Sequence, residues 1–330
     1  MNEPQRGSPE YPERWEDLVR RPRLRANARP PDEFRELFEG PPRHTREVRR
    51  VDRTQESWTR IGTDPVESYR PDWVEAAGKP RQAKLPPPPR VRHRGGAELE
   101  PLVIWHPDDR RTYNDHAFPW GCVCLITTAF GSRGSGVVIG PRHVLTASHV
   151  VEWSTDQAET IEVHRHGNGF RARTHATFAM AFTQIGDVGA TTLDEDYAVL
   201  VTEQRLGDAF GFLGTREYDS GWDDDHLWDT MGYATDIPQG AGQGLIPTFQ
   251  QRVALDEDEF DLGSGRAMTT TADAMKRQSG SPMFGTWGDQ TQVVAVISAT
   301  GEVFLSGTEN WCSGGSDLNR LVRKARTDFP

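Results

Sequence analysis

The sequence has few cysteines and no long apolar run, and each shortage excludes a class of protein. No stretch comes near the 18 consecutive apolar residues that a membrane helix needs, so we expect no membrane partner. Three cysteines (Cys122, Cys124 and Cys312) cannot form a disulfide framework, and an odd number of them favours a reducing compartment. The residues after Met1 lack the apolar core of a secretory signal, so we expect a cytoplasmic location.

Apolar residues are also scarce, at 35% of 330 residues, whereas glycine and proline contribute 32 and 23 residues. This composition is typical of a turn-rich β protein that carries a disordered segment. The net charge of −11 is uneven, because residues 1–100 hold 21 basic and 18 acidic side chains, while residues 101–330 hold 17 and 31. An acidic body argues against nucleic acid as its partner and favours basic substrates, or docking of the basic arm onto the body.

Residues 1–98 are predicted to form an N-terminal arm that is rich in arginine and proline and is disordered or partly helical. Only residues 15–19 and 34–38 have amphipathic spacing, and each covers one or two turns. The prolines within 80–94 are typical of a polyproline spacer, so we place the domain boundary there. The basic run at 90–95 could be a cleavage site or, more simply, a solvated linker.

Residues 99–330 contain short β-like runs that are separated by glycine turns. The strand candidates are residues 121–126, 136–140, 143–146, 160–164, 197–201, 227–233 and 291–297. About a dozen short strands with little helix between them predict an all-β sandwich or pair of barrels, not a parallel α/β sheet. Helical spacing is present only near the C-terminus, where Ser316 is predicted to be the N-cap.

Three motifs in this body carry groups that can act together. An apolar run ends in His149, a strand begins with Asp196, and Ser279 stands in a turn with glycine and proline. A serine hydroxyl needs a base to ionise at neutral pH, histidine has a suitable pKa, and a carboxylate would orient the imidazole. Asp194 is the rival carboxylate; we prefer Asp196 because the apolar strand begins directly after it.

We expect no metal and no cofactor. His164 and His166 share one face of a predicted strand, but the sequence offers no third ligand nearby. The acidic runs at 223–225 and 256–259 are interpreted as solvated loops, because calcium ligands must converge with a defined spacing.

With these motifs in the order His, Asp, Ser, residues 115–327 resemble the chymotrypsin-like serine endopeptidases, and most of all their bacterial glutamyl-endopeptidase branch. The resemblance rests on Gly134-Ser135-Gly136 before Thr146-Ala147-Ser148-His149, on Asp196-Tyr197-Ala198, and on Ser279-Gly280-Ser281-Pro282. It implies two six-stranded antiparallel β-barrels, at about 115–205 and 206–316, and a C-terminal helix at about 317–327. It also implies a catalytic triad of His149, Asp196 and Ser279 in the cleft between the barrels.

Two positions beside the nucleophile depart from the family pattern. The resemblance places the oxyanion-hole donors at the backbone N–H groups of Arg277 and Ser279, but most members carry glycine where this chain has Arg277. A side chain there keeps both donors, yet it resists the backbone angles that direct the first one. Gln278 has no charge with which to pair with a freed N-terminal amine, so we do not expect cleavage of the arm to be required for that pairing.

The third departure concerns the residues that would bind substrate. Asp273 stands where trypsin-like members keep the acid that selects arginine or lysine. The strand after the nucleophile carries Ser298 and Thr300, without the histidine that the glutamyl branch places there. We therefore assign Asp273, Ser298 and Thr300 to substrate binding and predict a basic or undecided preference, although Asp273 could equally be a solvated or structural acid.

The sequence thus predicts a serine endopeptidase that acts through an acyl-enzyme on protein or peptide substrates. It is expected to be intracellular and to be regulated by its arm or by a protein that docks on the arm. The alternative is a catalytically impaired protease-fold protein that serves as a protein-interaction module, because Arg277 could impair the oxyanion hole.

Overall fold

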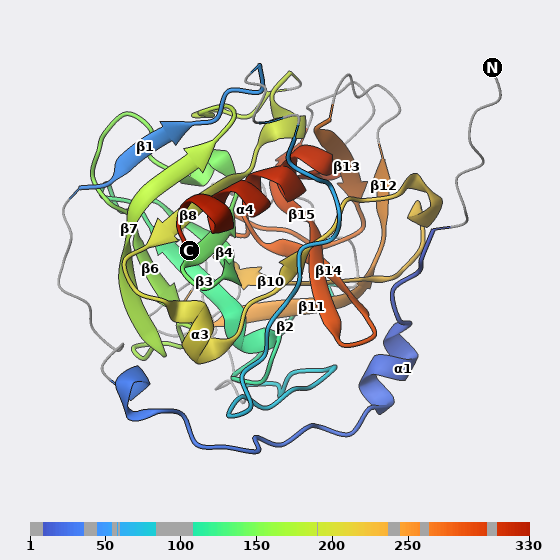
Figure 1. The fold of residues 1–330 in the computed structure, drawn as a ribbon. Helices are drawn as coiled ribbons and strands as arrows, with labels where there is room; N and C mark the ends of the chain where they lie inside the picture. Colours follow the sequence, from blue (N-terminus) through green and yellow to red (C-terminus); the bar gives the residue numbers. More distant parts are fainter. Residues whose placement is uncertain are drawn as a thin grey trace, which may run out of the picture.

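The computed structural model describes residues 9–35, 45–54, 58, 60–83, 108–189, 191–236, 245–257, 264–301 and 309–330. Two β-barrels lie side by side, and one long helix, α4 (Ser316–Asp328), crosses the outside (Figure 1). The predicted all-β class with two barrels and a C-terminal helix is therefore confirmed. None of the helices within the described ranges combines the length and the apolar character of a membrane span.

The first barrel contains six antiparallel strands in the order β7-β6-β3-β4-β5-β8, and β8 pairs again with β7 to close it. Val137, Val138 and Ile139 of β4 are fully buried, and such β-branched side chains favour extended backbone. The three cysteines are free and buried, two of them in and beside β3. The strand bounds are β3 (Val123–Thr127), β4 (Arg133–Gly140), β5 (His143–Thr146), β6 (Thr160–Val163), β7 (Ala172–Ala181) and β8 (Ala198–Thr202).

The second barrel has the order β12-β13-β16-β15-β14-β10-β11. Only Ala254 separates β11, which pairs with β10, from β12, which pairs with β13, so this one stretch joins the two ends of the sheet. Two short strands extend this sheet: β2 pairs with β11, and β9 pairs with β15. The bounds are β2 (Arg111–Thr112), β9 (Gly214–Thr215), β10 (Trp228–Tyr233), β11 (Pro247–Val253), β12 (Leu255–Glu257), β13 (Arg266–Thr270), β14 (Pro282–Trp287), β15 (Gln290–Gly301) and β16 (Glu309–Gly314).

Helix α4 packs a narrow apolar stripe on the first barrel. Leu318, Leu321, Val322 and Ala325 recur at helical spacing and are fully buried. Ser316 is the first helical residue and not the N-cap, which is Gly315, and the Ser316 hydroxyl donates to Ser264 O at 3.4 Å. The other helical segments are α1 (Trp15–Arg20), η1 (Asp32–Arg35), η2 (Trp120–Cys122), η3 (Ser148–Val150), η4 (Leu193–Glu195), α3 (Leu206–Phe210) and η5 (Ser220–Trp222).

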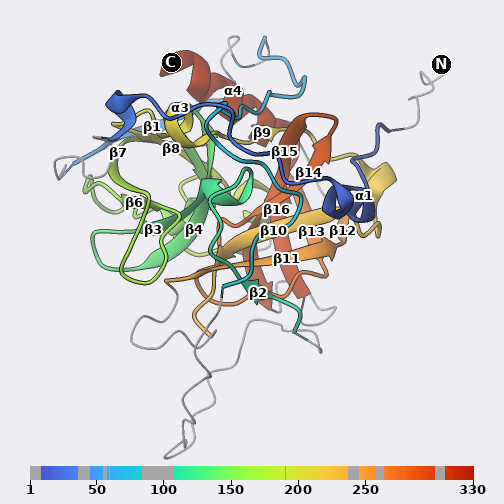
Figure 2. The same cartoon turned by 90° about the horizontal axis from the view of Figure 1, so that it is seen from below.

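The described segments of the arm run along the outside of both barrels (Figures 1 and 2). Strand β1 (Glu47–Arg50) pairs in parallel with β7, and Trp58 packs edge-on against Phe182 at 4.7 Å between ring centroids. Arg46 and Glu159 form an ion pair at 2.6 Å in which both side chains are fully buried. Since an unpaired buried charge is costly, this pair ties the arm to the first barrel.

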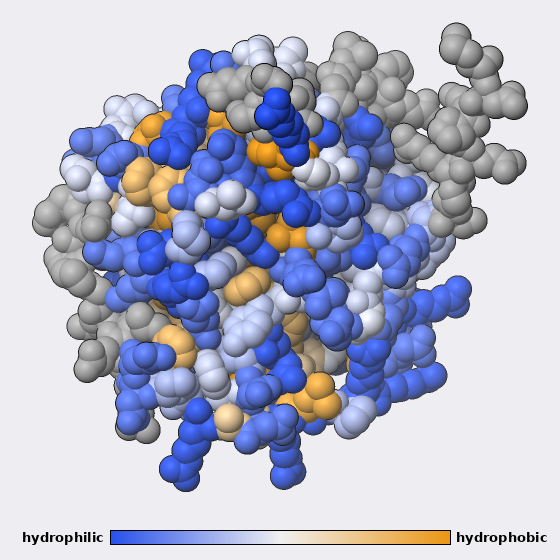
Figure 3. All heavy atoms as spheres, viewed as in Figure 1, coloured by the Kyte–Doolittle hydropathy of each residue, from blue (hydrophilic) through white to orange (hydrophobic). Residues whose placement is uncertain are grey.

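The described segments of the arm are mostly irregular and pack against the barrels. The predicted boundary at residue 98 lies outside the described residues, as does the basic run at 90–95. The face of the molecule that carries α4 is mainly hydrophilic, and its exposed apolar side chains form small separate patches (Figure 3).

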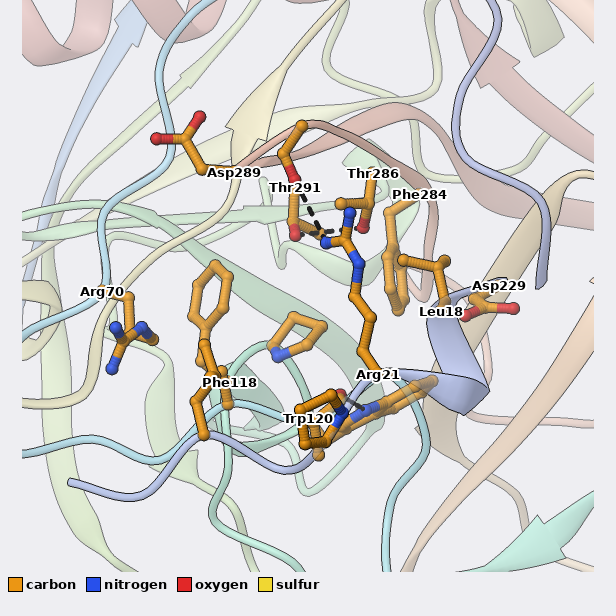
Figure 4. Close-up of a pocket in the computed structure, with 17 residues that line it drawn as sticks. Leu18, Arg21, Arg70, Phe118, Trp120, Asp229, Phe284, Thr286, Asp289 and Thr291 are labelled. Atoms are coloured by element: carbon orange, nitrogen blue, oxygen red, sulfur yellow. Dashed lines mark hydrogen bonds between the residues drawn. The ribbon is translucent and has the colours of Figure 1, made fainter. Parts of the chain in front are cut away.

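A cavity of about 280 Å³ remains where the arm meets the second barrel (Figure 4). Leu18 from the arm and Phe118, Trp120 and Phe284 from the body line it. Arg21 extends across this space toward Thr286 and Thr291, and its guanidinium donates to Gly288 O at 3.3 Å. The arm thus contributes both apolar and charged contacts to its own docking site.

Candidate active site

A cleft of about 530 Å³ opens between the two barrels. The first barrel contributes His149 and Arg133 to its wall, and the second contributes Ser279 and Ser298. Arg133 is the first residue of β4, and His149 lies in η3 just after β5, whereas Ser279 lies in the turn before β14 and Ser298 lies within β15. The fold therefore brings together residues that are far apart in the sequence.

His149 and Asp196 form a hydrogen-bonded pair at the edge of this cleft. His149 Nδ1 lies 2.6 Å from Asp196 Oδ2, and the backbone N–H of His149 donates to Asp196 Oδ1 at 2.9 Å. The Ser298 hydroxyl donates a further short hydrogen bond to Asp196 Oδ2. Asp196 is fully buried, so these three donors hold its carboxylate in one orientation. The pairing leaves Nε2 as the ring nitrogen that can accept a proton.

Ser279 lies in a turn whose backbone is held on both sides. Ser135 N–H donates to Ser279 O at 2.8 Å, and Gly280 N–H donates to Ile297 O at 2.7 Å. Gly280 has a φ of +83°, and a Cβ atom there would lie 2.2 Å from Ser135 O, so only glycine fits. The Ser279 hydroxyl donates to Ser298 O at 3.4 Å, a long hydrogen bond.

Arg277 adopts the left-handed backbone conformation that glycine favours, with a φ of +79°. The Ser135 hydroxyl donates to Arg277 O at 2.7 Å and accepts the backbone N–H of Tyr233 at 2.9 Å, so the fully buried Ser135 holds this peptide in place. A non-glycine residue in this region costs on the order of 1–2 kcal/mol. The turn therefore keeps a glycine-like backbone despite the arginine side chain.

Residues 134–296 match the family model described as "Trypsin-like peptidase domain", a span that includes His149, Asp196 and Ser279. The chain contains a trypsin-like peptidase domain. A solved structure titled "Structure of Glu endopeptidase in complex with MPD" shares its fold, with a TM-score of 0.56 and 18% sequence identity. That match covers 68% of this chain and 100% of the other. No curated protein matches this chain.

Of the three residues predicted to bind substrate, only Ser298 is found among the described residues that line the cleft. Ser298 lines the cleft, although its hydroxyl is bonded to Asp196. Thr300 belongs to β15, and its side chain lies outside the described part of the structure. Asp273 is 1% exposed and is not among the residues that line the cleft; its carboxylate accepts from Gln250 Nε2 at 3.2 Å and from the Asp109 N–H at 3.4 Å.

Basic side chains are the feature of the cleft that sequence reasoning missed. Arg133, Lys276 and Arg277 all line it, and no acidic residue does so within the described ranges. Burial and the nearby charge of Arg133 both lower the pKa of Arg277. The pair Lys276-Arg277 beside the nucleophile was visible in the sequence, but Arg133 joins it only through folding. The peptidase domain thus has a positive cleft in a chain with a net charge of −11.

Proposed function

We propose that the chain is a serine endopeptidase that hydrolyses peptide bonds through an acyl-enzyme. The observation that carries the proposal is the buried Asp196 carboxylate, which orients His149 at the same cleft that Ser279 lines. The Ser279 hydroxyl donates to Ser298 O, and the proposal requires it to turn toward His149 Nε2 when substrate binds, since catalytic hydrogen bonds are often loose before that step.

In the first half of the reaction, Ser279 Oγ attacks the carbonyl carbon of the substrate while His149 Nε2 takes the hydroxyl proton. Negative charge then develops on the carbonyl oxygen, where the backbone N–H groups of Arg277 and Ser279 are proposed to stabilise it. The protonated His149 next gives its proton to the leaving amine, the C–N bond breaks, and an ester to Ser279 remains.

Water completes the cycle. His149 removes a proton from water as the oxygen attacks the ester carbon, and it then returns that proton to Ser279 Oγ as the ester bond breaks. Throughout, Asp196 stabilises the imidazolium form of His149 and keeps Nδ1 protonated. The products are a peptide carboxylate and a peptide amine, and no other reactant is consumed.

Covalent labelling tests this function directly. A fluorophosphonate probe should add one group to each folded chain, peptide mass spectrometry should locate that group on Ser279, and labelling should stop hydrolysis of a peptide library. The same chain unfolded in denaturant serves as the control and should not react. A folded chain that is not labelled at Ser279 would overturn the proposal and favour the protein-interaction module.

The cleft charges lead to a prediction about substrates. Peptides with glutamate or aspartate next to the scissile bond should be cleaved faster than matched peptides with arginine, because three cations line the cleft. Lys276→Glu should lower kcat/KM for the acidic peptide about tenfold, an effect that added salt weakens.

Lys79→Glu is the matched control, since it makes the same charge change at an exposed position outside the cleft. It should leave kcat/KM unchanged for both peptides. A preference for arginine that Asp273→Ala removes would instead favour the sequence-based assignment of Asp273, and would contradict the interpretation from the cleft charges.

A further inference from the structure

Arg110 is a buried cation directly behind the turn that carries Ser279. Its side chain is 1% exposed, and Nη1 donates to Gln278 Oε1 at 2.9 Å. Gln278 is itself 2% exposed and immediately precedes Ser279. A hydrogen bond from a charged donor is roughly twice as strong as a neutral one, and burial removes the competition from water.

Gln278 links this cation to the backbone of the turn. Its Oε1 also accepts the Met275 N–H at 2.9 Å, and its own N–H donates to Met275 O at 2.9 Å. Its carbonyl accepts the Ser281 N–H at 2.8 Å. The side chain and backbone of Gln278 therefore hold both sides of the short segment that presents Arg277 and Ser279 to the cleft.

Two carboxylates in turn hold Arg110. Asp108 accepts from Arg110 Nε at 3.1 Å and from Nη2 at 2.9 Å, while Asp236 accepts from Nη1 at 3.2 Å and forms a close contact with Nη2. Burial lowers the pKa of Arg110, but the bonds to Asp108 and Asp236 outweigh it and raise the pKa above its ordinary value. The guanidinium is thus positively charged, the two carboxylates balance its charge, and their hydrogen bonds fix its position.

We infer that Arg110 is a positioning residue for the proposed peptidase: through Gln278 it holds the nucleophile turn in its working conformation. This inference rests on the proposed function. Because Arg110 lies within the chain and not at a terminus, its guanidinium is present before any cleavage. The intact chain, of 37.0 kDa, is therefore expected to be active without release of an N-terminal amine.

Two substitutions test the role of Arg110. Arg110→Ala should lower kcat on the order of 10–100-fold with little change in KM, because misplacing reacting groups by about 1 Å can cost 10²-fold. Free guanidinium ion should restore part of that loss by occupying the emptied site. Gln278→Met removes the side-chain amide that accepts from Arg110 and from the Met275 N–H, leaves the ion pairs of Arg110 in place, and should lower kcat by a similar factor.

Arg23→Ala is the matched control, because Arg23 also pairs with two carboxylates, Glu75 and Asp115, but has no bond to the nucleophile turn. It should leave kcat unchanged, and guanidinium should not affect it. If Arg110→Ala does not fold, Gln278→Met decides the question. An unchanged kcat in folded Gln278→Met would overturn the inference.

A readout independent of activity separates this inference from the proposed function. Hydrogen exchange of the peptide that spans 275–281 should quicken on the order of tenfold in Arg110→Ala and Gln278→Met, but not in Arg23→Ala. If the wild-type chain neither hydrolyses peptides nor reacts with the probe, the proposed function fails. Faster exchange in the two variants would still support the role of the Arg110–Gln278 hydrogen bond in holding the turn. Unchanged exchange in both variants would overturn the inferred role of Arg110, even if the enzyme is active. Intact mass of the labelled protein should show the uncleaved chain.

Discussion

Ser279→Ala is expected to lower kcat for peptide hydrolysis about 10⁶-fold, the loss seen when the nucleophile of a serine protease is removed. The reason is that no acyl-enzyme can form without Oγ, so His149 and Asp196 lose their proton donor. The change deletes one hydroxyl whose described hydrogen bond, to Ser298 O, is long at 3.4 Å. The melting temperature should therefore change little, and the activity loss can be read as chemistry.

The measurement is single-turnover hydrolysis of a fluorogenic peptide, after treatment with a fluorophosphonate to inactivate any contaminating wild-type enzyme. Ser281→Ala is the matched control, because Ser281 stands in the same turn and its buried hydroxyl has no partner among the described residues. It should retain activity within a few-fold. Hydrolysis that survives Ser279→Ala but not Ser281→Ala would show that the wrong serine was assigned.

Asp196→Asn is expected to lower kcat about 10⁴-fold. The carboxylate accepts hydrogen bonds from His149 Nδ1 and from the Ser298 hydroxyl at the same oxygen, Oδ2. An asparagine side chain has only one acceptor oxygen. When its NH₂ group takes the place of Oδ2, it faces these two donors and cannot accept from them. His149 would then keep its proton on Nε2, where it cannot accept the proton of Ser279.

Asp194→Asn provides the control, because the described hydrogen bonds of His149 reach Asp196 and not Asp194. It should leave kcat within a few-fold of wild type. Since a hydroxide can replace the missing base, the activity of Asp196→Asn should rise with pH, whereas that of Asp194→Asn should follow the wild-type profile. Equal losses in both variants would contradict the assigned roles.

The fold class could be predicted because its signals are local. Short apolar runs with β-branched residues correspond to β3, β4, β5, β6, β8, β10 and β15. Strands such as β7 and β11 were not singled out, because polar residues such as Arg173, His175 and Gln251 interrupt their apolar pattern. These strands are completed by pairing with neighbours on both sides, which is a non-local effect.

The arm shows the same limit. Its residues lack the apolar content to fold alone, so an irregular arm was a sound prediction. Its buried contacts come from the body: Glu159 neutralises Arg46, and Phe182 packs against Trp58. Such partners lie more than a hundred residues away, and no local pattern identifies them.

The sequence by itself determined that His149, Asp196 and Ser279 are the candidate reacting groups, because short local motifs are enough to predict strand ends and turns. Only the tertiary structure decided that Asp196 rather than Asp194 meets His149, that Asp273 is buried away from the cleft lining, and that Arg110 reaches Gln278. The physical reason is that hydrogen-bond partners and local charge depend on which strands the barrels bring together. The distances between such partners are set by the packing of segments that lie far apart in the sequence.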